Sequence, residues 1–354
     1  MLTFILSILI LGLLIFCHEA GHFFAARLFK VKVEEFAFGF PPTIWKKKKG
    51  ETEYKINLVP LGGYVRLLGE EDKVKDPRSY SSLKGRKKIV IIVAGVFVNI
   101  ALAWLLFSVG YMVGMSPIAL SPESLGGEKT GQIIVVEVSP NSAAEKAGLA
   151  EGDIINGFSS MEEFAQYTAQ HKGQEITLSI DGTTGARNVT AQLSSEDEAP
   201  LGVGLGGAGT KVKLGFFASF VAATREIGAF TKLMANFLWD IISSLFGPEK
   251  VSDSVKDVTG PVGIFTLTGQ AVKLGGIFIL QWIAILSLNF GLINILPFPA
   301  LDGGKAVFIM LDGVARRKVI KEEVEGLIHM IGFILLIILI LAITYKDVAV
   351  LITS

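Results

Sequence analysis

The chain has 354 residues with a formal net charge of zero, which gives no overall reason to expect nucleic acid as a partner. Hydrophobic residues make up 51% of the sequence, and the mean hydropathy of +0.54 is too high for an ordinary soluble enzyme. The composition suits a membrane protein with a soluble insert. The single cysteine, Cys17, excludes a disulfide framework and a cysteine-based metal cluster.

The first apolar stretch, Leu2 to about Leu28, is long enough to cross a bilayer, which needs roughly 20 residues. It lacks a basic start and a small-residue cleavage site, so we interpret it as a retained transmembrane helix rather than a signal peptide. Near its end, His18–His22 reads His-Glu-x-x-His. Two histidines one helical turn apart can bind one Zn²⁺, and Glu19 between them can act as a general base. Burying ionisable groups in an apolar stretch costs free energy, so the presence of three such groups here indicates a functional role for this motif.

A strongly basic region follows, and the positive-inside rule predicts that it is cytoplasmic. Its basic residues include Arg27, Lys30, Lys32, Lys46–Lys49, Lys55, Arg66 and Arg86–Lys88. Within it, residues 53–60 alternate like a strand, and residues 61–68 indicate a turn and a second strand. The pattern predicts a small hairpin whose edge can accept an extended peptide, or alternatively a hairpin with a purely structural role.

Residues 89–115 are predicted to form the second span, with Asn99 either joining helices or belonging to a polar site. Acidic residues outnumber basic ones between about 116 and 213, which predicts a soluble domain on the outer side. We expect strands at 132–138, 175–180 and 188–193 and helices at 143–146 and 161–171. Residues 202–207 are expected to form the last strand of this domain or its linker.

Residues 214–246 are apolar but interrupted by charges, and we expect a pair of amphipathic helices on the outer membrane surface. A turn is expected at 260–264, and further spans at 277–296 and 327–343. The third span ends in Asn294–Gly304, which contains asparagine, two prolines and an aspartate. Irregular backbone at membrane depth is tolerated only where it is buried or lines a cavity.

A catalytic zinc needs a third protein ligand, and Asp302 is the expected one, with His329 as the rival. If residues 214–246 do not span the membrane, Asp302 arrives at the same depth as His18 and His22. If they do span it, the site cannot form.

Three motifs together resemble the site-2 protease family of intramembrane zinc metalloproteases. They are HEAGH in the first helix, the string V-x-x-V-x-x-x-S-A-A-x-x-A-G-L-x-x-G-D-x-I typical of a bacterial PDZ domain, and N-x-x-P-x-P-x-L-D-G-G at Asn294–Gly304. The resemblance implies His18, His22 and Asp302 as zinc ligands and Glu19 as the catalytic acid/base. The sequence departs from the family pattern at two places. Gly39-Phe40-Pro41 stands where the family often has G-F-G, and Val96 stands where it often has the proline of A-G-P-x-x-N. Neither position is one of the implied metal ligands.

The resemblance also implies that Asn294 lies near the substrate backbone, and we expect Asn289 to contribute there. Leu61–Val65 is similar to the membrane-associated β-hairpin of the family, so Gly62, Gly63 and Tyr64 are expected to contact substrate. The implied partners are the lipid bilayer and single-pass membrane proteins, of the anti-sigma-factor or remnant-signal-peptide type. A peptide C-terminus at the PDZ-like domain is a further expected partner, whereas nucleic acid is not.

The expected fold is a polytopic α-helical membrane protein with about four transmembrane helices. It carries a cytoplasmic-side membrane-associated β-hairpin and an extracytoplasmic PDZ-like α+β insert. We expect an N-terminal membrane half at 1–115, the PDZ-like domain at 116–210, amphipathic helices and a linker at 211–276, and a C-terminal membrane half at 277–354. The expected location is the cell membrane, with the active site toward the cytoplasm. The alternatives are an inactive membrane PDZ scaffold, or a transporter with an ion site at Asn289, Asn294 and Asp302.

Overall fold

The computed structural model describes residues 2–70, 74–158, 161–182, 185–195, 199–246 and 260–353. The chain divides into two compact units, each of which is described by itself. The first comprises Met1–Leu106, Phe237–Gln270 and Trp282–Ser354, and the second comprises Phe107–Asn236 and Ala271–Gln281. Most of the expected linker after residue 246 falls at 247–259, outside the described residues.

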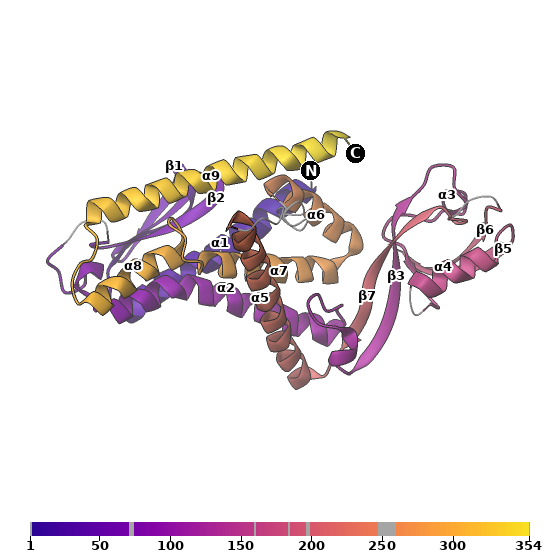
Figure 1. The fold of residues 1–354 in the computed structure, drawn as a ribbon, viewed down its shortest axis with the longest axis horizontal. Coiled ribbons are helices and arrows are strands. Elements are labelled where there is room, and N and C mark those ends of the chain that lie inside the picture. Colours follow the sequence, from indigo (N-terminus) through magenta and orange to yellow (C-terminus); the bar gives the residue numbers. More distant parts are fainter. Residues whose placement is uncertain are drawn as a thin grey trace. The chain divides into compact units, whose positions relative to one another are not determined.

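Four helices of the described chain are long and apolar enough to cross a membrane, as the sequence predicts. They are α1 (Leu2–Leu28), α2 (Gly85–Val113), α7 (Gly276–Asn294) and α9 (Glu322–Thr353) (Figure 1). Their apolar side chains include many that stay exposed in the folded chain, as expected for surfaces that face lipid. The protein is therefore a multi-pass membrane protein.

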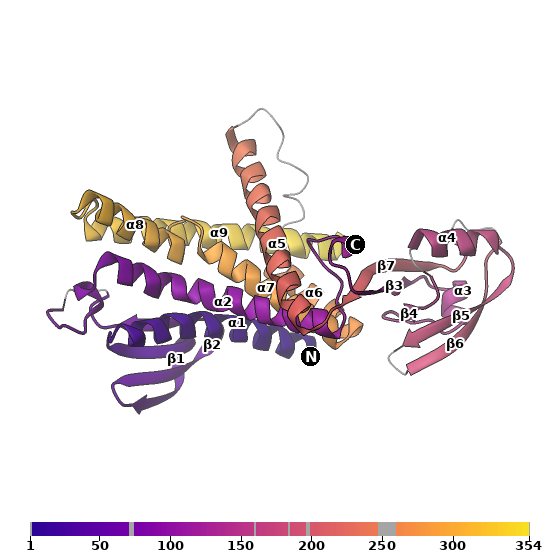
Figure 2. The same cartoon turned by 90° about the horizontal axis from the view of Figure 1, so that it is seen from below.

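In the first unit, α2 packs against both α1 and α7 (Figures 1 and 2), and small residues allow the close approach. A Cβ on Gly291 of α7 would lie 3.3 Å from the Val96 carbonyl oxygen of α2. Ser287 Oγ donates a hydrogen bond to the Asn99 backbone oxygen at 2.8 Å. The Asn99 side chain is buried, but neither of its polar atoms has a hydrogen-bond partner in the described chain. Asn99 therefore joins these helices through its backbone and not through its amide.

Strands β1 (Val33–Lys49) and β2 (Thr52–Leu67) form an antiparallel sheet along α1 (Figure 2). The two halves of β2 lie on opposite sides of the first half of β1, because Phe36 pairs with both Val65 and Tyr54. The predicted hairpin was therefore wrong in its pairing: residues 53–60 and 61–68 do not pair with each other. The strand between them, in the first half of β1, was not anticipated from the basic composition of this region.

A hydrophobic cluster attaches this sheet to the C-terminal half of α1. Phe36 and Leu67 of the sheet are buried together with Phe23 and Ala26 of α1 and Ile91 of α2. Burial of large apolar side chains stabilises by about 1.5–3 kcal/mol each relative to exposure to water. The cluster thus fixes the position of the sheet on the helix that carries His18 and His22.

The second unit contains a five-stranded antiparallel sheet in the order β6-β5-β4-β3-β7. Its elements are β3 (Glu128–Val138), α3 (Ala143–Lys146), β4 (Ile154–Ile155), α4 (Met161–Gln170), β5 (Glu175–Gly182), β6 (Gly185–Gln192) and β7 (Val203–Lys213). The predicted strands and helices are confirmed, and residues 203–207 belong to the last strand. The assignment of this unit to the PDZ fold stays a prediction.

Residues 216–246 form one continuous helix, α5 (Phe216–Phe246), so the expectation of a helix pair at 214–246 was wrong. Its interrupting charges lie on one long helix, and Glu226 among them is fully buried. The Glu226 carboxylate accepts hydrogen bonds from the Tyr111 hydroxyl at 2.7 Å and from the backbone N–H groups of Ile118 and Ala119 at 2.8 and 2.6 Å. These contacts explain why an apolar helix contains an acidic residue at this position.

The turn expected at 260–264 is the start of a helix, α6 (Pro261–Leu274). Proline is well suited to the first helical position, because its missing N–H needs no partner there. Asp347 of α9 accepts hydrogen bonds from the N–H groups of Gly260 and Gly263 at 3.0 and 2.9 Å, which caps this helix. The remaining helix, α8 (Asp302–Ala315), follows α7 after a short irregular segment, and short 3₁₀ turns occur at Tyr80–Ser82 and Pro122–Ser124.

Candidate metal centre

His18 and His22 face Asp302 across the interface between α1 and the start of α8. His18 Nε2 lies 2.9 Å from Asp302 Oδ2, and His22 Nε2 lies 3.3 Å from the same oxygen. The two imidazole rings are 4.7 Å apart between centroids. Candidate ligand atoms of the three residues all lie within 4.8 Å of one another. The structure therefore brings together the three residues that the sequence singles out, although Asp302 lies 280 positions or more from the two histidines along the chain.

The spacing of these atoms suits a zinc ion. Zinc–nitrogen and zinc–oxygen bonds of about 2 Å place neighbouring ligand atoms of a tetrahedral site roughly 3.3 Å apart. The separations of 2.9 and 3.3 Å from Asp302 Oδ2 to the two histidines lie close to that value. Two imidazoles and one carboxylate are also a ligand set that catalytic zinc uses with one position left open. The residues present thus fit the metal.

The orientation of His22 is fixed by its second ring nitrogen. His22 Nδ1 lies 2.8 Å from the Ile91 carbonyl oxygen of α2, so Nδ1–H donates and Nε2 is left with its lone pair toward Asp302. His18 Nδ1 is buried and has no partner in the described chain, while the His18 ring packs edge-on against Phe290 of α7 at 5.3 Å. The His22 imidazole is therefore held by α2 and the His18 imidazole by α7, in addition to their own helix α1.

Glycines on α1 and α2 make room for the two rings. A Cβ on Gly95 would lie 2.6 Å from His22 Nε2 and 2.9 Å from His18 Cε1, so only a residue without a side chain fits there. Gly21 contacts the Ala94 backbone so closely that a side chain at position 21 is likewise excluded. Gly95 is thus part of the site.

Asp302 is positioned by a tightly packed turn at the start of α8. Gly303 contacts the carbonyl groups of Ile295 and Leu296 so closely that no side chain fits at this position. Ala300 has a φ of +81°, and its N–H donates to His329 Nδ1 at 3.0 Å. His329 therefore supports the segment that leads into Asp302, and it is not a member of the ligand cluster found in the described chain.

Glu19 lies beside the edge of the β1–β2 sheet. A Cβ on Gly63 would lie 3.0 Å from Glu19 Cγ and 3.0 Å from the Ala37 carbonyl oxygen. The absence of a side chain at Gly63 thus lets the sheet edge approach the helix that carries the two histidines. The neighbouring Gly62 has a φ of +103° and packs against the Phe40 ring.

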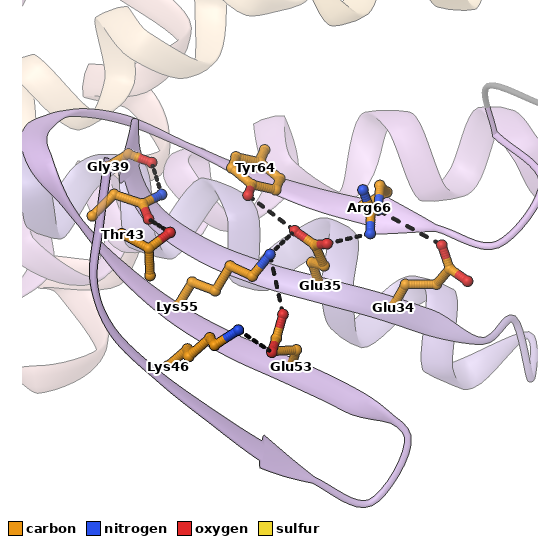
Figure 3. Close-up of polar contacts among 10 residues, drawn as sticks. Glu34, Glu35, Gly39, Thr43, Lys46, Glu53, Lys55, Tyr64 and Arg66 are labelled. Atoms are coloured by element: carbon orange, nitrogen blue, oxygen red, sulfur yellow. Dashed lines mark hydrogen bonds and ion pairs between the residues drawn. The ribbon is translucent and has the colours of Figure 1, made fainter. Parts of the chain in front are cut away.

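A polar network on the sheet holds this edge in place (Figure 3). The buried Glu35 carboxylate pairs with Lys55 Nζ at 2.6 Å, accepts from the Tyr64 hydroxyl at 3.0 Å, and pairs with Arg66. Burial alone raises the pKa of Glu35, but the hydrogen bonds from Lys55 and Tyr64 and the charge of Arg66 outweigh it, so the pKa lies below its usual value. Tyr64 therefore has a structural partner within the sheet.

The two asparagines proposed for substrate lie on α7 near the site. Asn294 Nδ2 donates to the Phe290 carbonyl oxygen at 2.9 Å, within its own helix. Asn289 Oδ1 is buried and without a partner in the described chain.

Sequence reasoning missed several residues that shape the site. The Ile91 carbonyl is a backbone group and leaves no sequence signal. Phe290 is one apolar residue in an apolar helix. Gly95 does carry a signal, because a glycine inside a predicted transmembrane helix often marks close helix packing. His329 was considered only as a ligand, whereas it hydrogen bonds to the backbone of the turn before Asp302.

Four membrane-length helices, together with two histidines and an aspartate placed so that they could hold one metal ion, define a multi-pass membrane protein with a candidate metal centre. Residues 6–339 match peptidase family M50. A protein of Clostridium acetobutylicum, provisionally named a zinc metalloprotease, is 35% identical over 97% of this chain and 96% of its own length. The zinc metalloproteases RasP of Geobacillus kaustophilus and Oceanobacillus iheyensis are 28% and 27% identical, over 96% and 98% of this chain and 96% and 99% of their own lengths. The chain therefore belongs to peptidase family M50, the site-2 type of zinc metalloprotease.

Proposed function

We propose that the protein hydrolyses peptide bonds within the membrane-spanning segments of single-pass membrane proteins, with a zinc ion held by His18, His22 and Asp302. The observation that carries the proposal is the convergence of these three side chains between helices of a multi-pass membrane protein. Substrates of the anti-sigma-factor or remnant-signal-peptide type fit such a site. The family membership and the ligand cluster favour an enzyme over the scaffold and transporter alternatives.

Glu19 is the proposed acid/base. Zinc, when bound, supplies a Lewis acid that lowers the pKa of water and polarises a peptide carbonyl. Glu19 follows His18 on α1, so its side chain is rotated by about 100° around the helix from that of His18. From there its carboxylate can take a proton from water and return it to the departing amine. His22 keeps its Nε2 directed at the centre because Ile91 accepts from Nδ1–H.

The sheet edge at Gly63 is the proposed substrate-binding edge, together with Gly62 and Tyr64. A helical substrate segment must open before its carbonyl groups can react, and an extended segment can pair with an open strand edge. Gly63 is the residue of this edge that approaches Glu19. Asn289 and Asn294 of α7 are proposed to hydrogen bond to the opened backbone from the other side.

The active-site end is proposed to face the cytoplasm, because the sheet region carries the excess of lysine and arginine. The second unit is then extracytoplasmic. We propose that it is a PDZ-like domain that selects substrates, either by excluding large ones or by binding a C-terminus. Deletion of residues 131–205 relaxes specificity if the domain excludes, and abolishes cleavage of the normal substrate if it binds.

Metal analysis combined with activity tests the proposal. Full-length protein in detergent should contain about one zinc per chain, and this zinc should be lost in His22→Ala and Asp302→Ala. Glu19→Gln should keep the zinc and lose cleavage of a single-pass reporter protein. Full cleavage by Glu19→Gln would overturn the acid/base assignment, and zinc retained in Asp302→Ala would overturn the ligand set.

A further inference from the structure

A basic pocket lies at the end of α1, away from the ligand cluster. Its volume is about 450 Å³, and its lining includes Arg27, Lys30, Glu51, Thr52 and Arg78. These residues come from the end of α1, the turn between β1 and β2, and the segment before α2. The proposed chemistry uses none of them.

The charges around the pocket do not balance. Arg78 pairs with Glu51, the one acidic residue of the lining. Arg27 lies over the Phe23 ring at 4.7 Å, and neither Arg27 nor Lys30 forms an ion pair with any residue that the structure describes. Three cations against one carboxylate leave an excess of two positive charges facing one cavity.

The backbone at Lys30 is unusual in a way that concerns this pocket. Lys30 N–H donates to the Arg27 carbonyl and Val31 N–H to the Ala26 carbonyl, which is the Schellman arrangement at the end of a helix. In that arrangement Lys30 occupies the left-handed position, with a φ of +61°, where glycine is the favoured residue. A lysine held at a glycine position keeps a cationic side chain in the pocket lining.

The pocket lies at the end of a helix that is long enough to cross the hydrocarbon core, which is where the headgroup layer of a bilayer begins. It begins where the membrane-length helix α1 ends at Leu28. Phe24 and Leu28, one turn apart at this end of α1, are 67% and 75% exposed, so apolar side chains suited to acyl chains lie next to the basic lining. Basic pockets beside transmembrane helices are suited to anionic headgroups.

We propose that this pocket binds the phosphate group of an anionic phospholipid, with Arg27 and Lys30 as the principal cations. Guanidinium and ammonium groups donate to phosphate oxygens, and Phe24 and Leu28 contact the acyl chains. Glu51 competes with the phosphate for Arg78. A bound lipid contacts both the end of α1 and the β1–β2 turn, and it therefore links the sheet to this helix.

Binding of dioleoylphosphatidylglycerol tests this, measured against dioleoylphosphatidylcholine by native mass spectrometry of the full-length protein. Lys30→Gly should weaken phosphatidylglycerol binding about fivefold, since one interfacial cation contributes about 1 kcal/mol. The same change should not lower the unfolding temperature, because glycine suits the backbone there. Glu51→Gln should tighten binding. Lys47→Gln is the matched control, because it removes one exposed lysine outside the pocket and should leave binding unchanged.

Inorganic phosphate, titrated by calorimetry, separates the two possible sources of the anion. Preference for phosphatidylglycerol over phosphatidylcholine, sensitive to Lys30→Gly and not to Lys47→Gln, supports the lipid site. Phosphate binding with the same variant pattern but without a lipid preference would assign the pocket to a soluble anion and overturn the lipid. Equal effects of Lys30→Gly and Lys47→Gln would show only diffuse attraction and overturn the site.

Discussion

Gly95 of α2 lies so close to His22 of α1 that a Cβ at position 95 would be 2.6 Å from His22 Nε2. That nitrogen is also the one that faces Asp302. A methyl group at position 95 must therefore displace the imidazole from the position it needs to share a metal with Asp302. A glycine of α2 thus sets the positions of the candidate ligands on α1 and α8.

Gly95→Ala is expected to lower zinc affinity about 10–100-fold, the usual range when the surroundings of a metal ligand are disturbed. Zinc per chain after dialysis against a weak chelator measures the effect. Gly228→Ala is the control, because this helical glycine has open space around its Cβ position and alanine there should be neutral or stabilising. Unchanged zinc affinity in Gly95→Ala would show that the helices can separate without cost.

Glu35→Gln is expected to loosen the sheet that lies beside Glu19. The change removes the negative charge between Lys55 and Arg66 and replaces one of the two acceptor oxygens with an NH2 group. The remaining oxygen cannot satisfy Arg66 on one side and Lys55 and Tyr64 on the other, and a lost buried hydrogen bond costs about 1–3 kcal/mol. Faster amide hydrogen exchange at residues 33–40 and 63–67, relative to wild type, measures the loosening. Glu34→Gln is the control, because Glu34 is more exposed and its pairs are longer.

The contribution of the Glu35 carboxylate to folding stability is expected to depend on pH. The pKa of Glu35 in the folded protein lies below its value of about 4.3 in an unfolded chain. Its contribution to stability is therefore fully present above about pH 4.3 and is lost as the pH falls through the lower, folded pKa. The difference in unfolding temperature between wild type and Glu35→Gln should be constant near neutral pH and shrink in acid. A difference that grows in acid would contradict the assignment.

His329 is expected to act on Asp302 through the backbone of Ala300. His329→Asn can keep an acceptor near the position of Nδ1, whereas His329→Leu leaves the Ala300 N–H unpaired at a cost of about 1–3 kcal/mol. We expect zinc and activity to be largely kept in the asparagine variant and reduced in the leucine variant. If both variants lose zinc completely, His329 is a ligand after all.

Glu226 is expected to matter for its oxygen atoms rather than for its charge. In Glu226→Gln the remaining oxygen can accept from Ile118 and Ala119, and the new amide can donate to the Tyr111 hydroxyl. Glu226→Leu leaves three donors without a partner and should cost about 3 kcal/mol or more. Thermal unfolding of the two variants distinguishes them. Equal destabilisation would show that the negative charge itself is required.

The candidate metal centre could be predicted from the sequence because it depends on a few ionisable residues that stand out in apolar segments. His18 and His22 are ionisable groups in an apolar helix, and Asp302 follows a stretch that no lipid-facing helix tolerates. The convergence of these three residues is confirmed, although their role as ligands stays a prediction. The supporting contacts from Ile91 and Phe290 could not be predicted, because a backbone carbonyl and a packed ring depend on how the helices are placed.

The β1–β2 sheet shows where sequence patterns fail. Residues 53–60 and 61–68 each have strand-like patterns, but alternation does not say which strand pairs with which. The pairing partner, residues 33–40, precedes a lysine run that obscured it. Likewise, the charges in 214–246 suggested an interruption, whereas Glu226 is satisfied within a continuous helix. Both errors concern long-range contacts that local patterns do not contain.

The pairing of Phe36 with both Val65 and Tyr54 has a consequence for how the sheet tolerates change in chain length. An inserted residue in 33–40 would shift the register against both halves of β2 and turn side chains of two ladders to the wrong face. An insertion at the turn near Gly50 would disturb neither ladder. The distance between Glu19 and the strand edge at Gly63 therefore does not depend on the length of the turn at Gly50.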